Sequence, residues 1–417
     1  MKIRYNLLTK CLSLIIIASA AFSVSGCKTE EDSKKANTSA ETKVSESSKK
    51  ESSIAVSSAQ ESSEEDNSKI PKEWKDDGIF SDYYDKAYEK MKKMSLDEKI
   101  GQMLMVRCPE ADAVDIAKDY HLGGYVLFGR DFIGKTRDEV IDNNNSYIKA
   151  PEIPMVISVD EEGGTVRRIS GNKRLTDQDF KSPRELFDEG GMEAIDADAL
   201  RKAQLLNDLK INVNLAPVCD ISTGTSNFMY DRSLGQNAEV TSIFASSVTK
   251  ISQENGISAT LKHFPGYGNN TDTHTGIAVD KRTYETFLNN DFKPFEAGIN
   301  AGAHMVLVSH NIVECMDKDN PASLSEKVHK ILREKLKFTG IIITDDLSMD
   351  AISKSSDGTP AEVRAVLAGN DMLCITDYDD AYNNIIDAVH TGKLDTDLID
   401  KAVMRIIAWK YAKGMIK

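Results

Sequence analysis

A lysine, two histidines and an aspartate lie close together in the segment 262–274 of this chain, which begins KHFPG and ends DTH. A carboxylate beside an imidazole can fix the tautomer of the ring and raise its basicity, as a general acid/base requires. Asp272 and His274 are therefore candidates for such a pair. A polar turn that merely contains histidine is the plainer interpretation of either residue alone.

Polar residues follow an apolar, strand-like run at five places. The run 257–261 leads into Lys262 and His263, and the chain after Gly266 is rich in Asn, Thr, Asp and Gly, which is typical of a loop. The other four polar groups lie at 160–164, at Asp220 with 230–233, at 309–311 and at 344–346. Polar and ionisable residues at the ends of several strands predict one shared functional site.

Eight apolar runs predict the strands that position these groups. They are continuous rather than alternating, as expected for parallel strands that are buried on both faces. The runs are Met103–Val106, Tyr125–Phe128, Met155–Val159, Val213–Ala216, Ile257–Leu261, Met305–Val308, Ile341–Ile343 and Met372–Ile375.

Helix signals separate the strands. Capping boxes begin at Ser95, Thr136, Ser182 and Thr359, and helical periodicity follows in 362–368, 381–390 and 398–411. The alternation over 74–417 predicts an α/β fold, a (β/α)₈ TIM-type barrel that forms a single catalytic domain. An open doubly wound sheet shares the alternation, but no G-x-G-x-x-G follows the first strand. We expect no second domain after the last helix.

The polar groups would meet at the C-terminal ends of the barrel strands, where such folds carry their active sites. A single aspartate after a strand more often caps a helix than reacts. That plainer interpretation suits Asp346 and could extend to Asp220, but it does not explain five converging loops. Carboxylates together with cations that bind hydroxyls are typical of glycoside hydrolysis.

Several sequence blocks make the hypothesis of glycoside hydrolysis more specific. KHFPGYG…DTH, SVDEEGG, NLAPVCD…DRSLG and GIIITDDLSM resemble the signature blocks of family 3 glycoside hydrolases, in their bacterial β-N-acetylglucosaminidase (NagZ-like) branch. The blocks occur in the order of the family, and the resemblance covers nearly everything from Ser95 to the C-terminus. EKIGQMLM near its start and AGNDMLCI near its end match as well.

The resemblance implies a role for each candidate residue. Asp345 would be the nucleophile that forms a glycosyl-enzyme in a retaining mechanism, and His274, paired with Asp272, would be the acid/base. Asp160 would bind sugar hydroxyls. The side chains that would hold the sugar and orient the nucleophile are Arg232, Lys262 and His263.

The same resemblance implies the substrate. It predicts an exo-acting β-N-acetylglucosaminidase that removes terminal β-linked GlcNAc from cell-wall or chitin-type saccharides, without a cofactor or a metal. Tyr267 stands where the family usually has histidine, Thr165 where it usually has arginine, and the 262–274 loop is slightly short. These departures concern the path of the loop and the neighbouring subsite, not the nucleophile or the acid/base pair.

Other functions remain open at this point. A β-glucosidase or a β-N-acetylglucosaminide phosphorylase would use the same fold, and a sugar-binding lipoprotein without activity would need Asp160 and Arg232 but not both Asp345 and His274. A zinc hydrolase could draw on His263, Asp272, His274 and His310, yet no H-E-x-x-H is present. No G-x-S-x-G supports a serine hydrolase.

The N-terminal region predicts export and anchoring. Basic residues precede a short apolar run that ends in VSGC, so residues 1–26 fit a lipoprotein signal peptide and Cys27 a lipidation site. Residues 27–73 are rich in Ser, Glu and Lys, which predicts a disordered tether. We therefore expect an extracytoplasmic enzyme, lipid-anchored to the cell membrane.

Composition bounds the partners. The formal net charge of −14 argues against nucleic acid as a ligand. The family resemblance implies a carbohydrate substrate, and VSGC implies a membrane contact through Cys27. We also expect a monomer. The four cysteines beyond the N-terminal region have no metal-ligand spacing, and we expect mostly buried free thiols.

Overall fold

The structure is a computed structural model that describes residues 70–268, 276, 278–349, 352 and 358–417. The chain divides into two compact units, Met1–Glu64 and Glu65–Lys417, and every described residue belongs to the second. The predicted signal peptide and Cys27 lie outside the described residues, as do Asp272 and His274.

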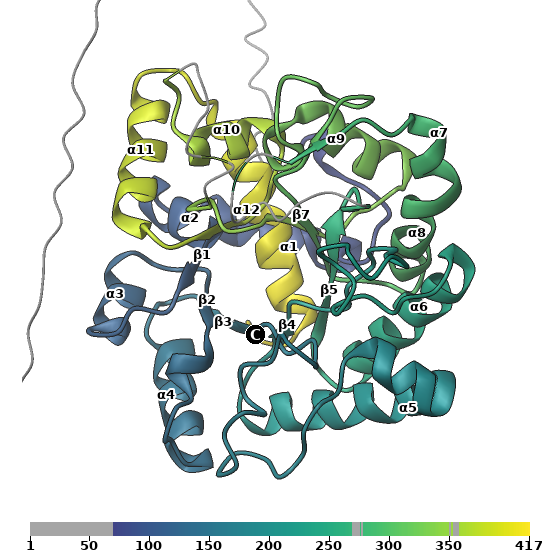
Figure 1. Cartoon of the computed structure of the whole chain (residues 1–417). Coiled ribbons are helices and arrows are strands. Elements are labelled where there is room, and N and C mark those ends of the chain that lie inside the picture. Colours follow the sequence, from purple (N-terminus) through teal and green to yellow (C-terminus); the bar gives the residue numbers. More distant parts are fainter. Residues whose placement is uncertain (1–69, 269–275, 277, 350–351, 353–357) are drawn as a thin grey trace, which may run out of the picture. The chain divides into compact units, whose positions relative to one another are not determined.

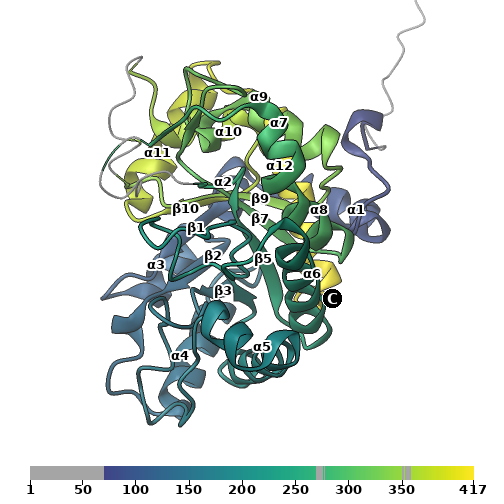
Figure 2. The same cartoon turned by 45° about the vertical axis from the view of Figure 1, so that its right-hand side comes forward.

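Eight parallel strands form the centre of the second unit, in the order β10-β1-β2-β3-β4-β5-β7-β9. A parallel bridge between Ile343 and Met372 links β9 to β10, so the sheet is nearly closed. Helices surround it (Figures 1 and 2). The predicted (β/α)₈ barrel is confirmed. The strands are β1 Leu104–Arg107, β2 Gly124–Leu127, β3 Val156–Val159, β4 Val213–Asn214, β5 Ser258–Phe264, β7 Met305–Val308, β9 Ile341–Thr344 and β10 Leu373–Ile375.

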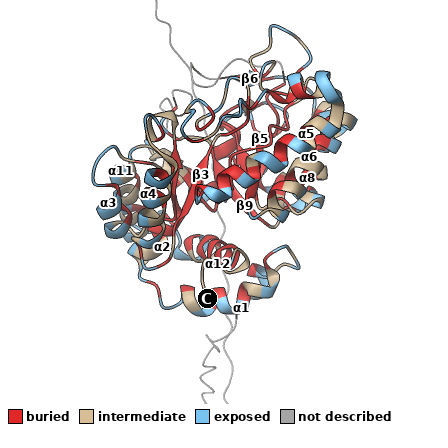
Figure 3. Cartoon of the chain, turned by 90° about the horizontal axis from the view of Figure 1, so that it is seen from below, coloured by how far each residue is buried: buried red, intermediate tan, exposed pale blue. Residues whose placement is uncertain are grey.

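The strands are largely apolar because helices cover one of their faces and the barrel interior lies on the other. Every residue of β2, β3, β7 and β9 is buried. Figure 3 shows the buried strands at the centre, with the largely buried helix α12 below them. The α-helices are α1 Tyr84–Met91, α2 Leu96–Met103, α3 Ala113–Asp119, α4 Arg137–Lys149, α5 Pro183–Asp208, α6 Ala238–Glu254, α7 Tyr284–Thr286, α8 Phe292–Asn300, α9 Glu326–Lys330, α10 Ala361–Ala368, α11 Tyr378–His390 and α12 Thr396–Ala412.

Three of the four predicted capping boxes form as expected. The side chains of Ser95, Thr136 and Ser182 accept a hydrogen bond from the backbone of the glutamate three residues later, at the starts of α2, α4 and α5. The fourth capping box was predicted at Thr359, but the N-cap position of α10 is Pro360 and the helix begins at Ala361. None of the helices in the described part of the chain combines the length and apolar character that a membrane span requires.

Strand β5 differs from its predicted length in a way that matters for the site. The apolar run ends at Leu261, but the strand continues to Phe264, so Lys262 and His263 lie within it. The chain after β4 runs alongside and extends the ladder: Lys262 N donates to Pro217 O at 3.2 Å, and Cys219 N donates to Lys262 O at 2.6 Å. The Lys262–His263 peptide is cis. The polar side chains of Lys262 and His263 are thus held by a central strand.

Two further features were not predicted. Strands β6 Val279–Asp280 and β8 Ile312–Val313 pair in a small parallel sheet of their own. Helix α5 is interrupted at Gly190 and Gly191, whose backbone is not helical.

The four cysteines in the described part of the chain are free thiols, of which Cys108 and Cys219 are buried and Cys315 is exposed.

Candidate active site

A cavity of about 660 Å³ contains all five of the predicted site residues that the structure describes. They come from different strand ends: Asp160 follows β3, Arg232 lies in the connection after β4, and Asp345 follows β9, while Lys262 and His263 belong to β5. The five residues therefore line one cavity, and their roles in the reaction stay predictions.

Asp345 continues the ladder of the strand that carries it. Its backbone N donates to Val308 O at 3.0 Å, and its Oδ1 accepts from Asp346 N at 3.0 Å. The neighbouring Asp346 instead closes a turn, because its Oδ1 accepts from Ser348 N and Oγ and its Oδ2 from Thr376 Oγ1. The two adjacent aspartates therefore have different surroundings, and Asp346 holds a turn rather than capping one of the described helices.

Lys262 is buried between two carboxylates. Its Nζ lies 2.7 Å from Asp160 Oδ1 and 2.6 Å from Glu162 Oε1, and its side chain is 2% exposed. Burial by itself would lower the pKa of Lys262, but Asp160 and Glu162 outweigh it and the pKa is raised. The ammonium therefore stays charged at neutral pH.

Glu162 also binds Arg232. Arg232 donates through Nε to Oε2 at 3.0 Å and through Nη2 to Oε1 at 2.7 Å, a bidentate pair. Burial would raise the pKa of Glu162, yet Lys262 and Arg232 together hold it well below its ordinary value. Glu162 thus orients two cations that the sequence assigned to sugar binding, although the sequence assigned no role to Glu162 itself.

His263 has partners on both ring nitrogens. Nδ1 lies 2.7 Å from Asp220 Oδ2, and Nε2 lies 3.2 Å from Arg232 Nη2. Since Arg232 can only donate, Nε2 accepts and the proton resides on Nδ1, where Asp220 accepts it. Asp220 also accepts from the backbone N of His263 and of Tyr267. It is not a helix cap but the group that sets the tautomer of His263.

Tyr267, the departure from the family pattern, lies in the same cavity. Its ring is 1% exposed and meets the ring of His263 edge-on, at a centroid distance of 5.2 Å. Phe228 is a second aromatic neighbour, at a centroid distance of 5.7 Å. The tyrosine therefore packs behind the imidazole and supports it.

Residues 160–164, the DEEGG loop, are fixed by polar contacts on the side away from the cavity. Glu161 is fully buried and accepts from Arg168 N and Ile169 N at 2.8 Å each. Gly163 has a φ of +102°, and a Cβ there would come within 2.2 Å of Lys181 O, so a side chain does not fit. The loop consequently places Asp160 and Glu162 with little freedom.

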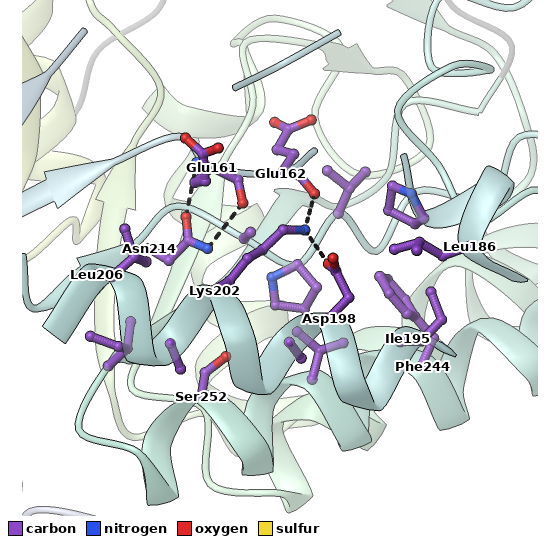
Figure 4. A pocket seen from close by; sticks show the side chains of 18 residues that line it. Glu161, Glu162, Leu186, Ile195, Asp198, Lys202, Leu206, Asn214, Phe244 and Ser252 are labelled. Carbon is purple, nitrogen blue, oxygen red and sulfur yellow. Dashed lines mark hydrogen bonds and ion pairs between the residues drawn. The ribbon is translucent and has the colours of Figure 1, made fainter. Parts of the chain in front are cut away.

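A lysine on α5 reaches the back of the same loop. Lys202 Nζ donates to the backbone O of Glu162 at 2.6 Å and lies 2.8 Å from Asp198 Oδ2 (Figure 4). Figure 4 also shows Asn214 beneath Glu161, where its side chain bonds both the N and the O of that residue. The supports come from helix α5 and strand β4, far from the loop in sequence.

The ring nitrogens of His310 and His263, the two described histidines of the zinc hypothesis, already have hydrogen-bond partners. His310 has Ser323 Oγ at 2.7 Å from Nδ1 and Asp346 O at 2.9 Å from Nε2, and both nitrogens of His263 are engaged as well. Within the described residues, no group of three or more His, Cys, Asp or Glu side chains is arranged to hold a metal ion. Asp272 and His274, the other two residues that a zinc hydrolase could use as ligands, lie outside the described residues.

Comparison with known proteins agrees with the fold. Residues 95–409 match the model of the glycosyl hydrolase family 3 N terminal domain. A β-hexosaminidase of Stenotrophomonas maltophilia K279a is 32% identical, over 66% of this chain and 82% of its own length. One of Methylobacillus flagellatus is 30% identical, over 68% and 82%.

Solved structures are similar over most of the described residues. A family 3 β-N-acetylglucosaminidase from Paenibacillus sp. FPU-7 has a TM-score of 0.71 and 27% identity, covering 77% of this chain and 63% of that one. A β-N-acetylhexosaminidase from Beutenbergia cavernae has a TM-score of 0.68 and 25% identity, covering 77% and 99%. By the extent of these matches, the chain belongs to glycoside hydrolase family 3.

Proposed function

We propose that the protein is a retaining β-N-acetylglucosaminidase that removes terminal β-linked GlcNAc from cell-wall or chitin-type saccharides. The observation that carries the proposal is the position of Asp345 in one cavity with Asp160, Arg232, Lys262 and His263. The curated relatives are β-hexosaminidases, and a similar structure is a β-N-acetylglucosaminidase.

The chemistry divides between a nucleophile and a proton carrier. Asp345 attacks the anomeric carbon and the bond to the leaving oxygen breaks, which gives a glycosyl-enzyme that water then hydrolyses. His274 gives its proton to the leaving oxygen in the first step and takes one from water in the second. Asp272 holds the imidazole.

The buried charges keep the sugar-binding groups in a fixed state. Glu162 stays anionic because its pKa is lowered, and Lys262 stays cationic because its pKa is raised. Neither group changes charge near neutral pH. We therefore expect neither Glu162 nor Lys262 to contribute to a pH dependence of activity near neutral pH.

Trapping of the glycosyl-enzyme tests the proposal. A 5-fluoro-GlcNAc β-fluoride reacts in the first step because fluoride leaves readily, but the ring fluorine slows hydrolysis of the intermediate. Mass spectrometry should find the sugar on Asp345, and Asp345→Ala should not be labelled. Asp346→Asn is the matched control on the same peptide and should still be labelled at Asp345. A label on any other residue would contradict the assignment.

We also propose that the enzyme is exported and anchored through a lipid on Cys27. The VSGC sequence and the basic, then apolar, N-terminus support this. Radiolabelled palmitate should enter the wild type and the Cys11→Ala control but not Cys27→Ala. Equal labelling of all three proteins would exclude the anchor.

A further inference from the structure

The guanidinium of Arg282 joins two buried carboxylates close to the end of β5. Arg282 follows β6, and its Nε donates to Asp280 Oδ1 and Oδ2 at 3.1 and 2.9 Å. Its Nη1 donates to both carboxylate oxygens of Asp291, at 3.0 and 2.9 Å. The side chains of the two aspartates are each 3% exposed, and the ring centre of Phe287 lies 4.3 Å from the guanidinium carbon. Arg282 is therefore held at its edge and on its face.

The same guanidinium lies against segment 266–268, which follows β5. Arg282 Nη2 donates to Gly266 O at 3.4 Å. A Cβ at Gly268 would come within 2.4 Å of the guanidinium carbon, and a Cβ at Gly266 would come within 2.5 Å of Asp291 Oδ1. Both glycines also have a positive φ, of +119° at Gly266 and +56° at Gly268. The backbone of the segment consequently approaches the ion pair as closely as only glycine permits.

Segment 266–268 connects this ion pair with the catalytic cavity. Asp220 Oδ1 accepts from Tyr267 N at 2.7 Å, and Asp220 Oδ2 lies 2.7 Å from His263 Nδ1. The ring of Tyr267 meets the ring of His263 edge-on, at a centroid distance of 5.2 Å. Tyr267 and His263 line the cavity, whereas Arg282 and Asp291 do not. An ion pair outside the cavity thus supports an imidazole inside it.

The charge of Arg282 offsets several carboxylates at once. Burial raises the pKa of Asp291 to about 6, although Arg282 opposes this rise. The negative charges of Asp220 and Asp280 contribute to the raised pKa, so both lie close enough to repel Asp291. A neutral residue in place of Arg282 would leave these three carboxylates together and endanger folding. A lysine keeps the charge, but it cannot bind two carboxylates and a carbonyl oxygen through one planar group.

We propose that Arg282 is a positioning residue of the active site, which fixes segment 266–268 and thereby holds Tyr267 against His263. The inference rests on the proposed function, in which His263 holds the sugar. Two glycines give the segment wide conformational freedom, and the contacts of Arg282 remove that freedom. Arg282 itself does not touch the substrate, so its effect passes through Tyr267.

The first test is Arg282→Lys, with GlcNAc as the probe of sugar binding. We expect the Kd of GlcNAc in titration calorimetry to rise roughly 10-fold, and kcat/KM for aryl β-GlcNAc to fall by a similar factor, because small displacements of positioned groups are costly. The sugar contacts do not depend on the leaving group, so dinitrophenyl and methoxyphenyl glycosides should lose the same factor. A purely structural role would lower Tm and leave the Kd of the folded enzyme unchanged.

Arg137→Lys is the matched control. Arg137 also binds a carboxylate and a carbonyl oxygen, since its Nη2 donates to Asp208 Oδ2 at 3.0 Å and its Nη1 to Leu175 O at 2.7 Å. It does not line the cavity. This variant should keep the wild-type Kd for GlcNAc and the wild-type kcat/KM.

A double-mutant cycle tests the route through Tyr267. Tyr267→Leu removes the ring that packs on His263, so it should raise the Kd of GlcNAc by itself. Once that ring is gone, Arg282 has nothing to position, and the double variant should bind GlcNAc no more weakly than Tyr267→Leu alone. Losses that simply add would show that Arg282 acts by another route, and the inference would be wrong.

Two other results would also overturn the inference. One is an Arg282→Lys enzyme with the wild-type Kd for GlcNAc. The other is a loss confined to the methoxyphenyl glycoside, which would place the effect of Arg282 on proton transfer instead of sugar binding. Failure of the proposed function looks different, because the wild type itself would then neither bind GlcNAc nor turn over aryl β-GlcNAc.

Discussion

Glu162 binds Arg232 through both carboxylate oxygens, at 3.0 Å from Nε and 2.7 Å from Nη2, in a site where the glutamate side chain is 1% exposed. The same carboxylate lies 2.6 Å from Lys262 Nζ. One buried anion thus sets the positions of two cations that arrive from different strands. The arrangement of the sugar-binding groups depends on a residue that need not touch sugar.

Replacement of Glu162 by glutamine should uncouple these cations. The amide keeps the shape but leaves Arg232 and Lys262 buried with one anion fewer, and removal of one partner from a buried pair costs about 3–5 kcal/mol. We expect a large fall in Tm and a loss of kcat/KM. Calorimetry and kinetics would measure both. The exposed pair of Lys181 and Glu189 supplies the control, and Glu189→Gln should change Tm little. A Glu162→Gln enzyme with normal stability and activity would contradict this assignment.

Lys202 should act on the site from the side of α5. Lys202→Met removes the bond to Glu162 O and leaves the buried Asp198 with only Arg201, at 3.5 Å. The DEEGG loop then loses a support, so we expect a drop in kcat/KM of roughly 10-fold, since small displacements of positioning groups are costly. Arg201→Ala, on the exposed side of the same carboxylate, should change kcat/KM little. Equal effects of the two substitutions would show that Lys202 has no specific link to the site.

The sequence predicted the scaffold and the five residues that line one cavity because those signals are local. Continuous apolar runs specify buried parallel strands, and polar residues at their ends specify the rim. The contributions of Glu162, Asp220 and Lys202 were not predicted, since each depends on contacts between segments distant in sequence. Asp220 was open to interpretation as a helix cap, and only its 2.7 Å contact with His263 reveals its role. The short strands β6 and β8 were missed because two residues carry no periodicity.

Lys410, on the buried face of α12, should make stability depend on pH. Burial lowers its pKa to about 7, although Nζ donates to Gln102 Oε1 at 2.6 Å and to Gly123 O at 3.2 Å. The folded protein therefore releases this proton at lower pH than the unfolded chain, whose lysine titrates at about 10.4. The unfolded chain binds more protons between these values, so stability rises with pH across that window, by an amount on the order of a few kcal/mol.

Lys410→Met should remove this rise. Denaturation at several pH values between about 7 and 10 would show a flatter dependence in the variant. Lys413→Met is unsuitable as a control because burial also lowers the pKa of that lysine. Lys250→Met, at an exposed position on α6, is suitable and should keep the wild-type slope. An unchanged slope in Lys410→Met would mean that the lysine is protonated in the folded protein throughout.

The assignment of His274 predicts a dependence on the leaving group. A poor leaving group needs a proton as the bond breaks, so His274→Ala should slow its release by roughly 10²–10⁴-fold. A good leaving group such as dinitrophenolate needs none, so the glycosyl-enzyme should still form and its hydrolysis should become the slow step. A pre-steady-state burst with the dinitrophenyl glycoside would report this. Asp272→Ala should resemble a milder form of the same variant, because the aspartate only orients the ring. Asp345→Ala should lose turnover with every leaving group, since it lacks the nucleophile. If His274→Ala lost the same factor for good and poor leaving groups, the histidine would bind substrate rather than transfer protons, and the acid/base would have to be another residue.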